Sequence, residues 1–175
     1  MKIAFIGSQG VGKTTLCYDL ASFFKRKNLS IGIVAELSRE AVKRGFLINQ
    51  DTTINSQVWI LMNQISQEIE SGNEFESIVC DRSVIDNYIY LLNKFGSQKP
   101  YETLVLEWIK TYDFLFKVPV IEKPEHDGVR STDLNFQKEI DKKLTEFLKK
   151  NNIKVHELSK NRDNWIKEIV SVIKI

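Results

Sequence analysis

The chain has 175 residues, of which 42 % are hydrophobic and 27 % charged, which suits one globular domain and excludes disordered, collagen-like and disulfide-rich proteins. Its 25 Lys and Arg residues against 23 Asp and Glu give a net charge of +2, so charge alone supports neither nucleic-acid binding nor attachment to a membrane surface. Its two Cys and two His residues have no paired spacing, which excludes a structural zinc module.

The apolar segments favour a cytoplasmic location. The longest apolar run, residues 58–62, has five residues, whereas a membrane-spanning helix needs about 20. The apolar run over residues 3–6 is too short for the core of a signal peptide. Cys17 and Cys80 lie in apolar segments, so we expect buried free thiols in a reducing compartment.

Short apolar runs alternate with longer amphipathic runs along the chain. The short runs predict strands over residues 3–6, 31–35, 78–80, 114–118 and 153–155. The amphipathic runs predict helices over residues 13–27, 38–45, 53–71, 83–95, 101–111, 133–150 and 163–173. This alternation predicts an α/β fold with a parallel sheet covered by helices, in a single domain over residues 1–175.

The segment between the first predicted strand and the first predicted helix matches G-x-x-x-x-G-K-[ST] at every fixed position. Glycines let the backbone N–H groups of such a loop turn towards a phosphate chain, and the following helix adds its positive N-terminal dipole. Lys13 should reach the β- and γ-phosphates of a nucleotide, and the Thr14 hydroxyl should bind Mg²⁺. The residues expected to bind the nucleotide are Gly7, Ser8, Gln9, Gly10, Val11, Gly12, Lys13, Thr14 and Thr15.

Two charged residues, Glu36 and Arg39, follow the second predicted strand. Ligands of open α/β sheets bind beyond the carboxyl ends of the strands, so both residues are candidates for the site. Glu36 could accept a proton from an attacking hydroxyl or hold a substrate hydroxyl. Arg39, one turn into the next helix, could bind a phosphate. A solvent-exposed position without a role is the alternative for each.

The predicted helix over residues 53–71 carries an apolar and a polar stripe. The residues predicted to form its buried face are Ile54, Val58, Leu61, Ile65 and Ile69. Gln57, Gln64 and Glu68 are spaced seven and four residues apart, which places them together on one face. Gln57 and Gln64 could bind substrate, because a side-chain amide can pair with the edge of a base. The spacing fits a solvated polar stripe almost as well.

Asp81 and Arg82 follow the third predicted strand. Asp81 is placed either to bind Mg²⁺ or to cap the helix that begins near Ser83. Arg82 and the more distant Arg130 could clamp phosphate oxygens during phosphoryl transfer. The sequence leaves open whether Glu36 or Asp81 is the general base.

The segment over residues 119–131 has no helical period and contains Pro119, Pro124 and Gly128. We expect it to be a lid that brings Arg130 to the site on closure; a solvated arginine at a helix start is the alternative. His126 and His156 have no nucleophile pattern near them, so we expect structural or surface roles.

Several motifs resemble those of the small P-loop nucleoside and nucleotide kinases, over nearly the whole chain and in the same order. They are GSQGVGKTT, AELSRE, Gln57…Gln64…Glu68, VCDRS and DGVRSTD. The nearest resemblance is to the nicotinamide riboside kinase domain of bacterial NAD-biosynthesis regulators, and a more distant one is to thymidylate and deoxynucleoside kinases.

The resemblance implies a three-layer fold, with a five-stranded parallel sheet of order 2-3-1-4-5. It implies that residues 7–14 bind the phosphates of ATP and that Asp81 and Arg82 form the acid–arginine pair of the family. Glu36 matches the family's acid after the second strand, and residues 127–130 match its lid. Many thymidylate and adenylate kinases carry several lid arginines where this chain carries one, which favours a nucleoside slightly over a nucleoside monophosphate.

The expected activity is therefore Mg²⁺-dependent transfer of the γ-phosphate of ATP to a small nucleoside-like acceptor, a nucleoside or a nucleoside monophosphate. A switch GTPase is disfavoured, because Asn93-Lys94 lacks the following Asp of the guanine-reading motif. A mechanical ATPase and a kinase acting on nucleic acid are the remaining alternatives, and the near-neutral charge disfavours nucleic acid. No membrane partner is expected, and a homodimer is left open.

Overall fold

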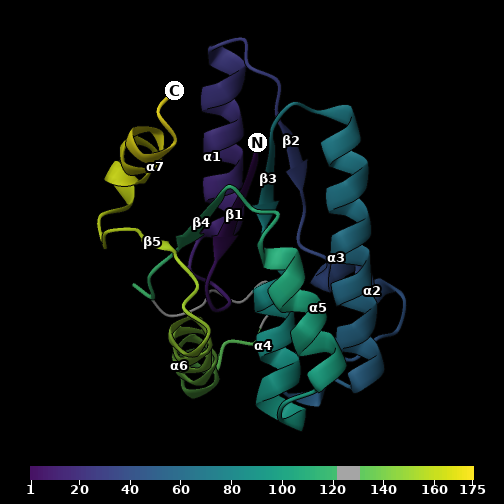
Figure 1. Ribbon diagram of the computed structural model, residues 1–175. Coiled ribbons are helices and arrows are strands. Elements are labelled where there is room, and N and C mark those ends of the chain that lie inside the picture. Colours follow the sequence, from purple (N-terminus) through teal and green to yellow (C-terminus); the bar gives the residue numbers. More distant parts are fainter. Residues whose placement is uncertain (122–130) are drawn as a thin grey trace.

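The computed structural model describes residues 1–121 and 131–175. Within them, five parallel strands form one sheet in the order β2-β3-β1-β4-β5, as drawn in Figure 1. The strands are β1 (Lys2–Ile6), β2 (Gly32–Val34), β3 (Ile78–Asp81), β4 (Phe114–Lys117) and β5 (His156–Glu157). The predicted fold class and the implied strand order are both confirmed.

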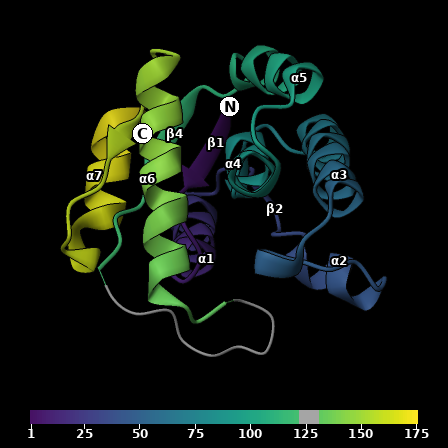
Figure 2. The same ribbon diagram turned by 90° about the horizontal axis from the view of Figure 1, so that it is seen from below.

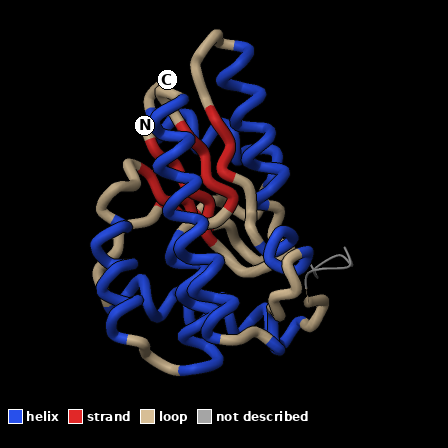
Figure 3. The backbone as a smooth tube through the Cα atoms, turned by 90° about the vertical axis from the view of Figure 1, so that its right-hand side faces the viewer, coloured by secondary structure: helices blue, strands red, loops and turns tan. Residues whose placement is uncertain are grey.

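The helices surround the strands, which Figure 3 draws in red between helices in blue. They are α1 (Lys13–Arg26), α2 (Ser38–Lys43), α3 (Ile54–Glu74), α4 (Val84–Phe95), α5 (Lys99–Ile109), α6 (Leu134–Lys150) and α7 (Trp165–Ile173), with short 3₁₀ helices η1 (Asn49–Asp51) and η2 (Arg162–Asn164). Each predicted helix is present, with ends shifted by three residues at most. Of the described helices, none is both long enough and apolar enough to cross a bilayer.

The central strand β1 is buried on both faces, as its continuous apolar sequence predicts. Ile3 and Phe5 point to one face, where they pack in a core shared with α1 and α7. Ala4 and Ile6 point to the other face, towards the helices α3 to α6. The view in Figure 2 shows α1 and α7 separated from α3, α4 and α5. This alternation produces the three layers.

Side-chain caps fix the starts of three helices that follow polar turns. Thr53 accepts a hydrogen bond from the Ser56 N–H at the start of α3, and Asp133 accepts from Asn135 at the start of α6. Ser83 caps α4, where its hydroxyl and the Asp86 side chain form a reciprocal capping box. Because Ser83 is the cap and Asp81 is the last residue of β3, the capping role considered for Asp81 is wrong, and its role in binding Mg²⁺ stays a prediction.

The position predicted for the fifth strand, residues 153–155, is wrong. Strand β5 is His156–Glu157, and it pairs with Phe116 and Lys117 of β4. Ile153 and Val155 instead pack against the core on the α6 side of the sheet. Their alternating pattern therefore arises because the segment after α6 is buried on one side, and not because it pairs as a strand.

The predicted buried face of α3 is also wrong in part. Ile54 and Ile69 are exposed, while Gln57, Gln64 and Glu68 are buried together with Leu61. The helix turns this polar face inwards because the Glu68 carboxylate accepts hydrogen bonds from one donor of α3 itself and from three donors in other parts of the chain. The donors are Lys2 Nζ at 3.0 Å, Gln64 Nε2 at 2.9 Å, Trp108 Nε1 at 2.8 Å and the Tyr112 hydroxyl at 2.6 Å.

Replacing Glu68 with glutamine is expected to lower the free energy of unfolding by about 1.5–3 kcal/mol, the usual contribution of hydrogen bonds to a charged group. The amide keeps the shape of the side chain but removes the charge that faces Lys2 and one of the acceptor oxygens. Urea denaturation measures the change. Glu70→Gln, at an exposed position of the same helix, is the matched control. Equal stability of the two variants would contradict a structural role for Glu68.

Candidate active site

The phosphate loop joins β1 to α1 at the carboxyl edge of the sheet. Gly7, Gly10 and Gly12 all have positive φ angles, of 151°, 76° and 96°. A Cβ atom on Gly7 would come within 2.9 Å of the Val118 carbonyl oxygen, so both the conformation and the space require glycine there. The loop thus has the turn that the sequence motif predicts, directly before the N-terminus of α1.

Lys13 is buried at the centre of this loop. Its Nζ donates to the carbonyl oxygens of Gly7 at 2.6 Å and Ser8 at 2.7 Å. The pKa of Lys13 is lowered from 10.5 to about 8, mainly by burial and secondly by the nearby positive charge of Arg82. The side chain is therefore still mainly protonated at neutral pH, and it carries a poorly solvated charge that an anion can neutralise.

Asp81 faces the loop from the end of β3. The Thr14 hydroxyl donates to Asp81 Oδ2 at 2.5 Å, which places two hard oxygen ligands side by side. The pKa of Asp81 is raised, mainly by burial and secondly by the negative charge of Glu36. Mg²⁺ commonly takes one or two protein oxygens and completes its shell with waters and substrate phosphates, so these two residues fit it. In the described part of the chain, no cluster of three or more His, Cys, Asp or Glu could hold a metal unaided.

Glu36 and Arg82 form a buried ion pair beside Asp81. Arg82 Nε lies 2.7 Å from Glu36 Oε1, and each side chain is only 7 % exposed. The Ser38 hydroxyl donates to the same carboxylate oxygen at 2.9 Å, and the Arg82 guanidinium lies 5.2 Å from the centre of the Tyr90 ring. Arg82 has a φ of 90°, an uncommon conformation for a residue with a Cβ. The pair is thus held in place by contacts on several sides.

One small hollow, of about 10 Å³, connects these groups. It is lined by Gly10, Val11, Gly12, Lys13, Thr14, Glu36, Asp81 and Arg82. The structure therefore brings together the phosphate loop and three of the charged residues predicted for the strand ends.

A second hollow is also lined by Arg82. It measures about 20 Å³, enough for about one water molecule. Its lining residues are Ser38, Ile48, Asn49, Gln57, Ile60, Arg82, Asn87 and Tyr90. Gln57 Nε2 donates to the Thr52 hydroxyl at 2.8 Å, whereas Asn87 Nδ2 is buried with no hydrogen-bond partner among the described residues. A polar group in this hollow would satisfy it.

Other predicted site residues lie elsewhere. Gln64 is turned away from the hollow, since its amide donates to Glu68 and, at 3.4 Å, to the Arg82 carbonyl oxygen. Arg39 is an exposed residue of α2. His156 is exposed on β5, as predicted. Arg130, His126 and most of the predicted lid lie outside the described residues.

Asp86 was not singled out from the sequence. Its Oδ1 accepts from the Gly7 N–H at 2.8 Å, and its Oδ2 accepts from the N–H and hydroxyl of Ser83 at 2.8 and 3.0 Å. The carboxylate thereby ties the start of the phosphate loop to the turn after Asp81. The S-x-x-D spacing from Ser83 to Asp86 is the signal that could have identified it.

A groove of about 290 Å³ runs from the start of α1 to the start of α7. It is lined by Gly12, Thr15, Leu16, Asp19, Arg162, Asp163, Trp165 and Ile166. The Trp165 ring lies 3.6 Å from the position that a Cβ atom on Gly12 would take, so the groove adjoins the phosphate loop. No sequence pattern indicated this groove, because Trp165 is far from the phosphate loop in the sequence. The two come together only in the folded chain.

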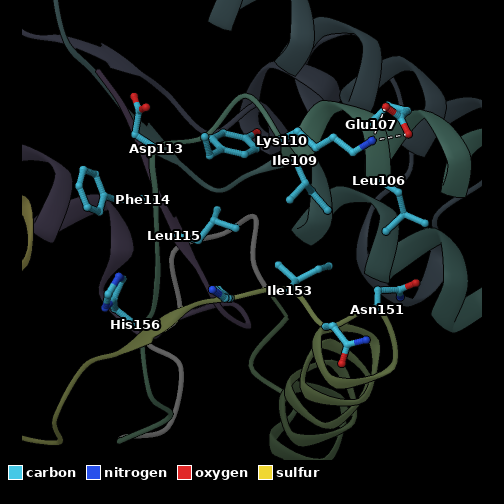
Figure 4. A pocket seen from close by; sticks show the side chains of 13 residues that line it. Leu106, Glu107, Ile109, Lys110, Asp113, Phe114, Leu115, Asn151, Ile153 and His156 are labelled. Atoms are coloured by element: carbon cyan, nitrogen blue, oxygen red, sulfur yellow. Dashed lines mark hydrogen bonds and ion pairs between the residues drawn. The ribbon is translucent and has the colours of Figure 1, made fainter.

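The largest hollow described, about 560 Å³, is not part of this site. Figure 4 shows it between the end of α5, the start of β4 and the segment after α6, with Lys110, Phe114 and Ile153 among its lining residues. It therefore lies at the amino edge of the sheet. Ligands of open α/β sheets bind at the opposite edge, where the phosphate loop lies.

Solved structures with a similar fold are kinases of nucleosides and nucleotides. Thymidylate kinase from Ehrlichia chaffeensis matches with a TM-score of 0.70 and 20 % identity, covering 99 % of this chain and 98 % of that one. Deoxyadenosine kinase from M. mycoides with bound dATP matches with a TM-score of 0.67 and 19 % identity, covering 100 % of both chains. The same enzyme with the products dCMP and dCDP gives 0.68 and 18 %, covering 99 % of both.

The chain therefore has the fold of the P-loop nucleoside and nucleotide kinases. No curated protein matches the sequence. The model of one family, described as AAA domain, matches residues 2–164, and the chain thus belongs to that family.

Proposed function

We propose that the protein transfers the γ-phosphate of ATP to a small nucleoside-like acceptor, a nucleoside or a nucleoside monophosphate. The observation that carries the proposal is the hollow that joins Lys13 and Thr14 of the phosphate loop to Asp81 and to the Glu36–Arg82 pair. These groups can bind a polyphosphate on one side and activate a hydroxyl on the other. The kinases of similar fold support the same activity.

The nucleotide would bind with its phosphates in the loop and its base in the groove beside Trp165. The loop N–H groups, the dipole of α1 and Lys13 would hold the β- and γ-phosphates. Thr14 and Asp81 would hold Mg²⁺, which shields phosphate charge when bound. Arg162 lies 5.8 Å from the Trp165 ring, and the two flat groups offer surfaces for stacking a base.

The acceptor would occupy the hollow beyond Arg82, with its hydroxyl directed at the γ-phosphate. Gln57 and Asn87 supply amides that can pair with the edge of a base. Small-molecule sites usually measure about 300–1,000 Å³, so the hollow must widen when the acceptor enters. Before the acceptor enters, the narrow hollow would keep water away from the γ-phosphate of ATP.

In the transfer, the acceptor oxygen loses its proton and forms a bond to the γ-phosphorus, while the bond from that phosphorus to the β-phosphate oxygen breaks. Glu36 is the proposed proton acceptor, because the proposal assigns Asp81, together with Thr14, to Mg²⁺. Arg82 would stabilise the charge on the transferred phosphoryl oxygens. Arg130 and the lid over residues 119–131 stay predictions, since residues 122–130 are outside the described chain.

A nucleoside acceptor is slightly favoured over a monophosphate, because the sequence of residues 127–130 carries one arginine where many thymidylate and adenylate kinases carry several. One domain over residues 1–175 is supported by a sheet that includes strands from both halves of the chain. A cytosolic location is supported by Cys17 and Cys80, which are buried free thiols.

Replacing Asp81 with asparagine is expected to weaken Mg²⁺-dependent activity without lowering the free energy of unfolding. A carboxyl whose pKa is raised by folding stabilises the fold only while it is protonated, so at neutral pH its charge costs stability and the neutral amide removes that cost. Activity as a function of Mg²⁺ concentration and thermal unfolding measure the two effects. Asp113→Asn, at the opposite edge of the sheet, is the control. A lower melting temperature with normal Mg²⁺ dependence would contradict the metal-binding role.

A panel of acceptors tests the proposed function. The protein is incubated with Mg²⁺ and labelled ATP, and with nucleosides, nucleoside monophosphates or short oligonucleotides, one class in each reaction. We expect label to appear in a nucleoside or a monophosphate product. Label confined to oligonucleotides, or transfer to none of the three classes, would contradict the proposed function.

A further inference from the structure

Gln137 reaches the phosphate loop from the first turn of α6. Its side chain is completely buried. Its Nε2 donates to the Gln9 carbonyl oxygen at 2.8 Å, across 128 positions of the sequence. Only the amide nitrogen can donate to a carbonyl, so this bond fixes the orientation of the Gln137 side chain. A side chain of α6 thus holds one peptide group of the loop in a set direction.

The amide of Gln137 is only half satisfied. Its Oε1 is buried and has no hydrogen-bond partner in the described part of the chain. A buried polar atom without a partner costs stability, whereas methionine would fill the same space without a polar atom. Phe136 and Ile140, its buried neighbours on α6, are both apolar. Packing alone therefore does not account for a glutamine here, and the bond to Gln9 is its distinguishing contact.

A fixed Gln9 carbonyl also fixes the N–H of the next residue. The peptide group is planar and trans, so the Gln9 C=O and the Gly10 N–H point in opposite directions. Gly10 has a φ of 76° and lines the small hollow together with Lys13 and Asp81. Over residues 1–121 and 131–175, its N–H has no hydrogen-bond partner. It is therefore available as a donor to a ligand.

Gln9 is held from a second side by α4. The Tyr90 hydroxyl donates to Gln9 Oε1 at 2.9 Å, and both side chains are buried. The backbone and the side chain of this loop residue are thus bound to two different helices. Such a residue cannot turn its peptide group without breaking a contact, which keeps the loop in one conformation before a ligand arrives.

We infer that Gln137 is a positioning residue for the nucleotide: by holding the Gln9 carbonyl, it directs the Gly10 N–H at the β- or γ-phosphate. The inference rests on the nucleotide-binding part of the proposed function. Backbone N–H groups that face inward make such a loop a phosphate site. If the peptide group could rotate, it would sometimes present its carbonyl oxygen, which repels phosphate. A donor that is already aligned needs no reorientation when the ligand binds.

The affinity of the loop for phosphate tests this role. Inorganic tripolyphosphate with Mg²⁺ is the probe, because it can occupy the loop but has no base or sugar. Gln137→Met keeps the length of the side chain and removes the donor, so the dissociation constant should rise about tenfold, for tripolyphosphate and for ATP alike. The melting temperature should change little, since the variant loses one hydrogen bond but also one unpartnered buried oxygen.

Ile140→Val is the matched control. Ile140 is buried on the same helix, three residues further along. The substitution should lower the melting temperature, because it removes a buried methyl group, but it should leave the affinity for tripolyphosphate unchanged. The pair of variants separates the direction of the Gly10 N–H from the general stability of α6.

A labelled sample reports on the Gly10 N–H itself. Gln9-Gly10 is the single Gln-Gly pair in the sequence, so glutamine labelled with ¹³C at the carbonyl and glycine labelled with ¹⁵N give one linked amide signal. Saturating tripolyphosphate should move this signal downfield in the unmodified chain, as expected of an N–H that donates to an anion. In Gln137→Met the movement should be clearly smaller, also at saturation.

Three results would overturn the inference. The first is equal affinity for tripolyphosphate in Gln137→Met and the unmodified chain. The second is a Gly10 signal that tripolyphosphate leaves in place. The third is an equal loss of affinity in Ile140→Val, which would reduce Gln137 to a packing role. A chain that gives the expected affinities but transfers phosphate to no acceptor would contradict the proposed function and support this inference.

Discussion

Replacing Lys13 with alanine is expected to lower kcat about 10²–10³-fold, equivalent to about 3–4 kcal/mol of transition-state stabilisation. Lys13 is the buried cation of the phosphate loop, held by the carbonyl oxygens of Gly7 and Ser8. Negative charge moves onto the bridging oxygen between the β- and γ-phosphates as that bond breaks, and the ammonium is placed to stabilise it. The rate at saturating ATP and acceptor measures the loss.

Folding must be separated from catalysis in this variant. Burial lowers the pKa of Lys13, so its removal relieves a desolvation cost but also removes its hydrogen bonds to Gly7 and Ser8, and thermal unfolding measures the balance. Lys25→Ala, in the last turn of the same helix, is the matched control and should keep full activity. A folded Lys13→Ala protein with near-normal kcat would exclude the phosphate loop from the reaction.

Replacing Glu36 with glutamine is expected to lower kcat about 10²–10⁴-fold, the range that general acid–base catalysis contributes. The amide keeps the size of the side chain and can still accept from Ser38, but it cannot take a proton from the acceptor hydroxyl. It also leaves the buried Arg82 guanidinium without its counter-ion. Since ATP would be held by the loop and not by Glu36, the affinity for ATP should change much less than kcat.

Glu40→Gln is the control for this variant. Glu40 lies on α2 in an exposed pair with Arg44, so the substitution removes the same charge nearby without touching the site. The pH dependence gives an independent readout, because loss of the base should remove the acidic limb of the kcat profile. Equal activity of the two variants, or an unchanged acidic limb in Glu36→Gln, would assign the proton transfer to another group.

Much of the fold follows from patterns that the sequence displays. The strands β1, β2 and β3 are short and mainly apolar, and most of their residues are buried. Gly7 follows β1 directly, Glu36 lies two residues after β2, and β3 ends on Asp81. The buried side of α3 could not be predicted in full, because the apolar residues Ile54, Met62 and Ile69 of that helix are exposed. A carboxylate that collects four donors from α3, β1, α5 and the segment after α5 outweighs the apolar pattern there.

The site was predictable where its residues follow directly from a strand. Gly10 to Thr14, Glu36, Asp81 and Arg82 come together because parallel strands end at one edge of the sheet. The sequence patterns missed three residues near the hollows, Asn87, Tyr90 and Trp165. Asn87 and Tyr90 lie inside α4 and Trp165 begins α7, so only the packing of these helices brings them to the site. Gln64 matched the pattern of a substrate-binding amide, but its partner is Glu68.

The fate of the γ-phosphate tests the central claim most directly. ATP labelled in the γ-phosphate is incubated with the protein and Mg²⁺, first alone and then with the acceptor chosen from the panel. We expect slow release of inorganic phosphate from ATP alone, and rapid transfer of label to an acceptor hydroxyl once the acceptor is added. Rapid release of inorganic phosphate that no nucleoside or nucleoside monophosphate suppresses or diverts would show an ATPase and contradict the proposed phosphotransfer.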